Sequence, residues 1–221
     1  MHTFDIPAPI NAVLDIPAGR IHIFADDQAG TTVEISPADA GKDRDVRAAK
    51  SIEVAHADGV LRIEAPQPEG LLLGSSGSVD VTVRLPAGSS VEAKSAAAEL
   101  RGTGRLGDVA FEGASGTVEL EETAAARVTL QSGDVTVVRL GGDAELVTRQ
   151  GDLRVTEAVR GTVTLRTEHG GISIGAARGT SASLDAGTTY GRIVNSLTNT
   201  GDIGLTIRAT TSPGDITATS L

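Results

Sequence analysis

The sequence predicts an all-β protein: a single-stranded β-solenoid, in which one chain winds into a parallel β-helix-like stack of turns of about 17–23 residues. Three observations support this fold. A glycine-led unit recurs, a second alternating segment lies between successive units, and the apolar residues are mostly aliphatic. Hydrophobic residues make up 39% of the chain and aromatic residues only 2%, so we expect thin aliphatic layers in the core.

The recurring unit reads Gly-Asp-aliphatic-x-aliphatic. It appears as QSGDVTV at residues 131–137, as QGDLRV at 150–155 and as SPGDITA at 212–218. A repeat this short cannot bury its apolar face alone, whereas stacked repeats bury a continuous one. The glycines that open the units are spaced 17, 18, 19, 21 and 23 residues apart and are Gly116, Gly133, Gly151, Gly170, Gly191 and Gly214.

Each repeat should carry two strands, because a second short alternating segment lies between successive units. Period-2 alternation places Val137 and Ile174 on the core face and Thr136 on the solvent face. Glycine suits the corner because it accepts positive φ, and the Asp beside it can bond the backbone of its own turn. We expect the turns to stack in chain order. An antiparallel sandwich of the same strands, joined by hairpins, is the alternative.

Residues 1–90 are less regular. They predict an irregular, β-rich N-terminal cap, continuous with the repeat solenoid of residues 91–221 in one structural domain. Such a cap would cover the unpaired strand edges at one end of the stack. Residues 39–50 are charged and predict a short helix or a mobile loop, and residues 66–78 predict a flexible connection from their Pro, Gly and Ser content. No comparable cap is apparent at the C-terminal end.

Composition excludes several classes of function. A net charge of −10 argues against binding along a nucleic-acid backbone and against docking on anionic lipid. The absence of cysteine excludes disulfides and thiolate chemistry. The first residues lack a secretory pattern and no segment approaches eighteen apolar residues, so we expect a soluble, cytoplasmic protein without membrane insertion.

The repeated units, the lead-in VDVTVRLPAGSSVEAKSAAAELRGTGRLGDV at residues 79–109 and the ending at residues 190–218 resemble one bacterial family. It is the family of putative adhesins of unknown function with a β-strand-repeat, DUF4097-like domain. The resemblance runs from about residue 5 to the end. It implies a β-solenoid, an attributed adhesin function, and no established catalytic residues to carry over.

Candidate chemistry is sparse, and we expect neither catalytic residues nor a cofactor. Asp134 and Asp152 occupy equivalent positions on adjacent turns, where they are either solvated corner carboxylates or a weak metal site. His169, beside Glu168 and one turn from Tyr190, could form a small polar site or simply an exposed corner.

These patterns predict a non-enzymatic structural or interaction protein. Its scaffold would bind a protein partner through the polar strand faces. One alternative is a carbohydrate-binding or polysaccharide-active β-helix protein, with lyase or hydrolase activity. Another is self-assembly through an uncapped end or strand edge. The predicted interaction face consists of Thr136, Arg154, Ser173 and Thr217.

Overall fold

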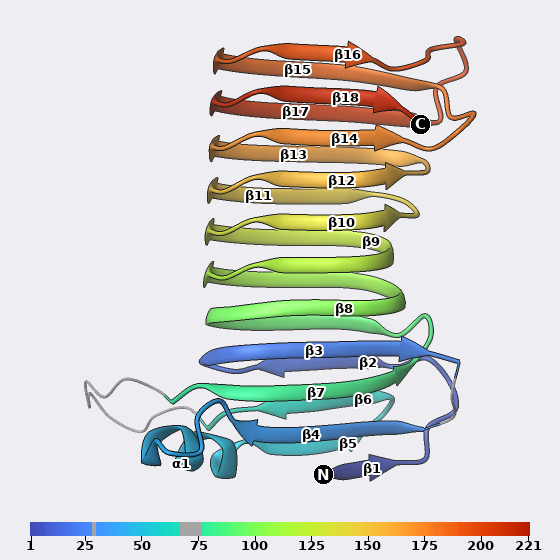
Figure 1. Ribbon diagram of the computed structural model, residues 1–221. Coiled ribbons are helices and arrows are strands. Elements are labelled where there is room, and N and C mark those ends of the chain that lie inside the picture. The colour runs from blue at the N-terminus through green and yellow to red at the C-terminus, as the bar shows by residue number, and fades with distance from the viewer. Residues whose placement is uncertain (28–29, 67–76) are drawn as a thin grey trace.

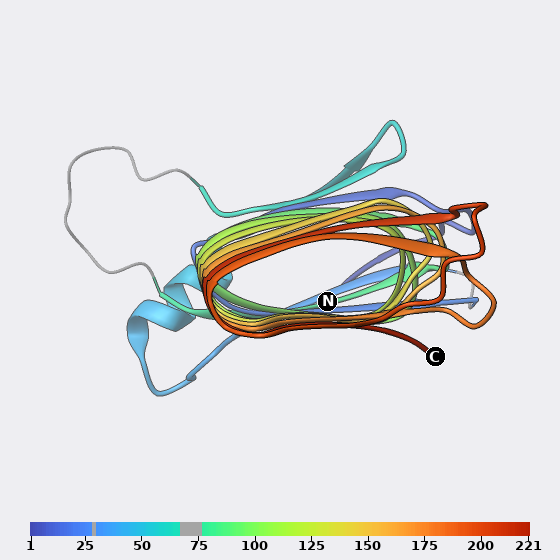
Figure 2. The ribbon, with the colours of Figure 1, turned by 90° about the horizontal axis from the view of Figure 1, so that it is seen from above.

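The computed structural model describes residues 1–27, 30–66 and 77–221. The chain forms a flattened coil whose turns stack along one axis (Figure 1) and superimpose when viewed down that axis (Figure 2). Successive turns of the repeat region pair in parallel, as β10 with β12 and β11 with β13. The predicted all-β solenoid is therefore confirmed, and the alternative of a hairpin-built sandwich is wrong.

Eighteen strands and one helix make up the described part of the chain. Those of the less regular half are β1 (His2–Phe4), β2 (Asn11–Asp15), β3 (Ala18–Asp26), β4 (Thr31–Pro37), α1 (Asp43–Ser51), β5 (Glu53–Ala57), β6 (Val60–Glu64) and β7 (Val79–Pro86). The repeat region contains β8 (Ser90–Ser115), β9 (Val118–Ser132), β10 (Val135–Leu140), β11 (Ala144–Gln150), β12 (Leu153–Ala158), β13 (Gly161–His169), β14 (Ile172–Ala176), β15 (Ala182–Tyr190), β16 (Ile193–Ser196), β17 (Leu205–Pro213) and β18 (Ile216–Ser220).

The strands lie in two facing layers. We name sheet 1 the layer ordered β5-β6-β2-β8-β9-β11-β13-β17-β15. Sheet 2 is the layer ordered β1-β4-β7-β3-β8-β9-β10-β12-β14-β18-β16. The long strands β8 and β9 bend around corners and contribute to both layers. Each regular turn thus supplies one strand to each sheet.

The space between the sheets is filled by columns of aliphatic side chains. Val118, Val135 and Leu153 are direct neighbours on successive strands and are at most 1% exposed. The predicted inward residues Val137 and Ile174 are 0% and 1% exposed. Burying an aliphatic side chain of this size contributes roughly 1.5–3 kcal/mol, so the columns form one continuous stabilising core.

The turns do not all stack in chain order, which corrects the sequence-based expectation. The last turn, β17–β18, lies between β13–β14 and β15–β16 (Figure 1). The inward positions of β18 are Ile216 and Ala218, whereas their partners on β16 are Ile193 and Asn195. Burying an unpaired amide is costly, so the fully aliphatic turn occupies the interior and the turn with Asn195 occupies the end.

The N-terminal half shows a similar exchange. Strands β2 and β3 pair in parallel with β8 on one side and with β6 and β7 on the other. Strands β1, β4 and β5 run antiparallel to their neighbours and close this end, with α1 at one corner (Figure 1). The charged segment at residues 39–50 thus contains a helix. The boundary at residue 90 stays a prediction, and most of the connection expected at residues 66–78 lies outside the described residues.

Candidate functional site

The four residues of the predicted interaction face lie in one column on the outside of sheet 2. Thr136 pairs with Arg154, Arg154 with Ser173, and Ser173 with Thr217. Adjacent strands are about 4.8 Å apart, so these side chains form an unbroken row across four strands. The row exists because each residue sits between two inward-facing aliphatics of its own strand, as Thr136 does between Val135 and Val137.

Arg154 differs in its pairing from several charged residues on the outer surface. Arg101 and Glu119 form an ion pair of 3.9 Å across adjacent strands, and Arg139 contacts both Glu122 and Glu157. Within residues 1–27, 30–66 and 77–221, no ion pair involves Arg154, and its side chain is exposed. Exposed ion pairs stabilise a protein by less than about 1 kcal/mol. The guanidinium of Arg154 is thus available to an incoming carboxylate.

The corner aspartates bind the backbone of the next turn. Asp134 Oδ1 accepts a hydrogen bond from the N–H of Asp152 at 2.8 Å, and Asp152 Oδ1 accepts one from the N–H of Gly171 at 2.7 Å. We expected these carboxylates to bond their own turn, and this expectation is wrong. The N–H groups of Asp152 and Gly171 point along the stack toward the preceding turn. A backbone N–H needs an acceptor, and the aspartate of that turn supplies one.

The column of corner residues follows the exchanged order of the turns. Sequence order predicts Gly171, then Arg192, then Asp215, whereas β18 places Asp215 between the other two. Asp215 accepts the backbone N–H of Arg192 at 2.8 Å and its guanidinium at 3.1 Å. The Arg192 backbone N–H, and secondarily its side chain, hold the pKa of Asp215 below the ordinary value.

Among the described residues, no three His, Asp or Glu side chains converge as metal ligands. One oxygen of Asp134 and one of Asp152 already accept a backbone hydrogen bond. Weak cation binding by these two carboxylates stays a prediction.

The glycine before each corner aspartate is required by a close approach between turns. At Gly133 the φ angle is +140°, and a Cβ atom there would lie 1.6 Å from the carbonyl oxygen of Gly116. At Gly151 the same atom would lie 2.1 Å from the carbonyl oxygen of Gly133. Any side chain would collide with the backbone of the turn beside it. Contacts between adjacent turns therefore explain both residues of the Gly-Asp repeat: the glycine allows the close approach, and the aspartate bonds the next turn.

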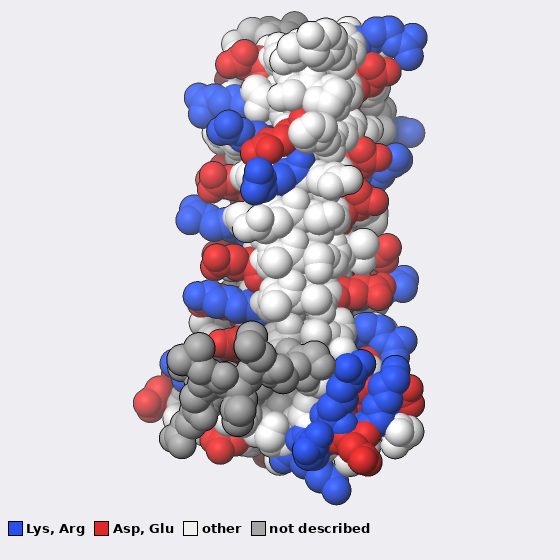
Figure 3. Space-filling view, turned by 90° about the vertical axis from the view of Figure 1, so that its left-hand side faces the viewer, with Lys and Arg blue, Asp and Glu red and all other residues white. Residues whose placement is uncertain are grey.

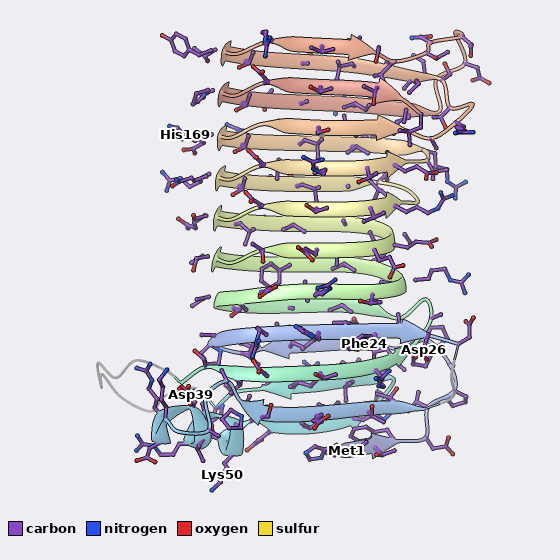
Figure 4. The ribbon with its side chains drawn as sticks, in the orientation of Figure 1. Met1, Phe24, Asp26, Asp39, Lys50 and His169 are labelled. Carbon is purple, nitrogen blue, oxygen red and sulfur yellow. The ribbon has the colours of Figure 1, made fainter. Side chains whose placement is uncertain are left out.

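The charged residues of the corner, such as Asp134, Asp152 and Arg192, lie beside its outermost edge. Figure 3 shows a column of uncharged residues along this edge, flanked on both sides by Lys, Arg, Asp and Glu. His169 projects outward at the same edge (Figure 4), near Arg149 and Glu168, whose side chains are 3.5 Å apart. Tyr190 is not one turn from His169 as expected, because β17 lies between β13 and β15.

Sheet 1 carries a shallow depression on its outer surface, with a volume of about 870 Å³. It forms where the small side chains of Ala110 and Ala125 lie between longer ones on neighbouring strands. Glu92, Arg127 and Glu145 stand around it, and Arg127 pairs with Glu145 at 3.7 Å. None of the described residues that line it is aromatic. Its acidic and basic groups could bind a polar ligand.

The comparison with protein families decides the identity of the fold. The model of the Toastrack DUF4097 family matches residues 13–219. The chain belongs to this family. The predicted resemblance is thereby confirmed, and the Toastrack domain includes β2 and β3 as well as the repeat region.

Solved structures resemble this Toastrack chain at low sequence identity. A putative adhesin from Bacteroides fragilis is 14% identical, with a TM-score of 0.59 over 98% of this chain and 95% of its own. A putative adhesin from Parabacteroides distasonis is 13% identical, with a TM-score of 0.47 and the same coverage. A putative lipid binding protein from Parabacteroides distasonis is 14% identical, with a TM-score of 0.45, again over 98% and 95%. The first of these supports the fold, and none of the curated proteins matches the chain.

Sequence reasoning missed one feature of the Toastrack corner, a column of buried threonine hydroxyls. Thr148 donates to the carbonyl of Gly133 at 3.2 Å, and Thr167 donates to that of Gly151 at 2.9 Å. Each of these threonines lies three residues before a corner glycine, a spacing that could have indicated the column. Thr188 and Thr211 repeat the spacing and the bond.

No helix within the described residues has both the length and the apolar character that crossing a bilayer requires.

Proposed function

We propose that this chain is a non-enzymatic interaction module that binds a protein partner through the outer column of sheet 2, formed by Thr136, Arg154, Ser173 and Thr217. One observation carries the proposal: these side chains are direct neighbours on four successive strands. Their hydroxyls both donate and accept hydrogen bonds, and the guanidinium offers paired donors to a carboxylate. Strands fixed on both sides present this row without a large ordering cost.

The proposal is tested by reversing the chemistry of the column. Thr136→Glu with Arg154→Glu should leave the fold intact, because both side chains face solvent, and should abolish capture of the partner. The matched control is Thr164→Glu with Arg166→Glu on the outside of sheet 1, which makes the same change in residue type and charge. A photocrosslinking residue at position 173 should mark the same partner.

Three outcomes separate the possibilities. Loss of one captured protein in the sheet 2 variant alone, together with its crosslink to position 173, supports the proposal. Equal capture by both variants contradicts it. Loss in the control variant alone moves the site to sheet 1.

Glycan binding is a second candidate, favoured by the depression on sheet 1. Acidic and basic groups such as Glu92 and Arg127 stand around it, as in sites for charged sugars. The absence of aromatic residues among its described lining weakens this candidate, since sugar rings commonly stack on such platforms. Binding of acidic oligosaccharides that is lost in Arg127→Ala would support it. Turnover of those sugars would support the enzymatic alternative.

The location of the protein in the cytoplasm stays a prediction.

A further inference from the structure

The end of the stack formed by β15 and β16 exposes two strand edges. Strand β15 pairs with β17 and strand β16 with β18, and no described strand pairs with their other edges. The N–H of Ala182 donates to the carbonyl of Thr198 at 2.9 Å, so the free edge of β15 begins after this residue. The N–H of Ile216 donates to the carbonyl of Arg192 at 2.8 Å, so the backbone groups of the next residue, Ile193, face the free edge. Unpaired edges of this kind are templates for another strand.

Apolar side chains gather at the same end. Among the residues that the structure describes, seven large hydrophobic side chains are exposed, and four of them lie within residues 190–203: Tyr190, Ile193, Val194 and Ile203. Tyr190, the only tyrosine of the chain, is 77% exposed. Ile193 continues the inner column, Val194 lies beside Thr217 on the outer face, and Tyr190 lies beside Pro213 at the corner, so apolar groups border this end on several sides.

Ile193 shows that the core is open here. It continues the buried column that runs through Ile172 and Ile216, which are 2% and 0% exposed. Ile193 itself is 45% exposed, because no further turn covers it in the described chain. Ile193 is therefore an inward-facing core residue that is covered by a neighbouring turn on one side only.

Charge at this end does not oppose association of two copies. The chain as a whole carries a net charge of −10, whereas residues 182–204 contain only Asp185, Arg192 and Asp202. Arg192 is already paired with Asp215. Two such ends can approach with little of the repulsion that the rest of the acidic surface would produce.

We propose that two copies of this chain associate end to end through β15 and β16, around a twofold axis perpendicular to the stack. The two free edges run in opposite directions, so a twofold copy meets each of them with an antiparallel strand. At the opposite end, the outer strands β1 and β5 each have one partner, but they are only 3 and 5 residues long, and Met1 is the only exposed large hydrophobic side chain among the described residues there. Because that end offers shorter edges and fewer exposed apolar side chains, we expect association tail to tail that stops at a dimer.

The test measures the mass of the full chain in solution over a wide range of concentration. The monomer mass is 22.4 kDa, and we expect a reversible shift to twice that value. Ile193→Lys places a charge at the open core and should weaken the dimer by at least about tenfold. Val138→Lys is the control: it introduces the same charge at an aliphatic residue on β10, in the middle of the stack, that is 47% exposed.

Amide hydrogen exchange gives a second measurement that does not depend on a variant. Protection of residues 182–196 should rise with concentration in the wild type, while protection of β10 stays constant. A mass of 22.4 kDa at all concentrations would overturn the proposal. So would continued growth beyond a dimer, or equal effects of the two lysine substitutions on the dimer.

Discussion

Asp134 and Asp152 lie on adjacent turns, and the carboxylate of the first accepts the backbone N–H of the second at 2.8 Å. Asp152 repeats this bond with the N–H of Gly171 at 2.7 Å. Two acidic residues one turn apart thus form a chain of hydrogen bonds along the stack. Each aspartate gives its turn a fixed position relative to the next one.

The corner bond of Asp152 should contribute measurable stability. Asp152→Ala removes the acceptor of the Gly171 N–H and should lower the free energy of unfolding by about 0.5–1.5 kcal/mol. Asp152→Asn keeps an acceptor oxygen and should have the smaller effect. Urea unfolding of the three proteins measures this difference. Alanine and wild-type proteins of equal stability would show that the bond contributes nothing.

The glycine of the same unit should tolerate no side chain. Gly151→Ala would place a Cβ atom 2.1 Å from the carbonyl oxygen of Gly133, at a φ of +145°. We expect a loss of at least about 2 kcal/mol in thermal or urea unfolding, because the turns must separate. Gly187→Ala is the control, since nothing lies within 4 Å of a Cβ atom there. Equal effects of the two substitutions would refute the close-contact explanation.

Neighbouring valines on β10 should respond oppositely to a charge. Val137 is 0% exposed and Val138 is 47% exposed. Val137→Asp buries an unpaired carboxylate in the aliphatic column and should cost at least about 4 kcal/mol, enough to unfold many domains. Val138→Asp should retain the cooperative thermal transition. A folded Val137→Asp protein would contradict the inward position of this side chain.

Asp215 should titrate below an ordinary aspartate. The backbone N–H of Arg192 is the main cause of its lowered pKa, and the guanidinium adds to it. Because the folded-state pKa lies below the unfolded value of about 3.9, the bond stabilises the fold above that pH. This stabilisation is lost as the pH falls through the folded-state pKa.

Carbon NMR of the Asp215 carboxyl checks this directly. In Arg192→Ala the backbone N–H remains, so the pKa should rise only part of the way toward its ordinary value. A wild-type pKa at or above about 3.9 would contradict the prediction.

Much of this architecture could be predicted from local patterns. The alternation around Val137 indicated which side chains are buried, and the same alternation placed Thr136 and Arg154 on the outer face of their strands. Both properties depend only on neighbours within one strand. The register of those two residues followed from the spacing of the glycine-led units.

The order of the turns could not be predicted in the same way. Gly191 and Gly214 both satisfy the corner geometry, so the repeat does not distinguish which turn lies outside. The order depends on the cost of burying Asn195 relative to Ala218 at the same inward position. These residues are distant in sequence, and no pattern within one repeat contains both. The depression on sheet 1 was missed for a related reason, because Ala110 and Ala125 meet only after β8 and β9 have paired.

The exchanged position of β17–β18 has a consequence for synthesis of the chain. Strands β15 and β16 emerge from the ribosome before the strands on which they rest. They therefore lack the partner strands β17 and β18 until residues 205–220 have also emerged. During that interval the nascent chain presents the unpaired edges of β13 and β14.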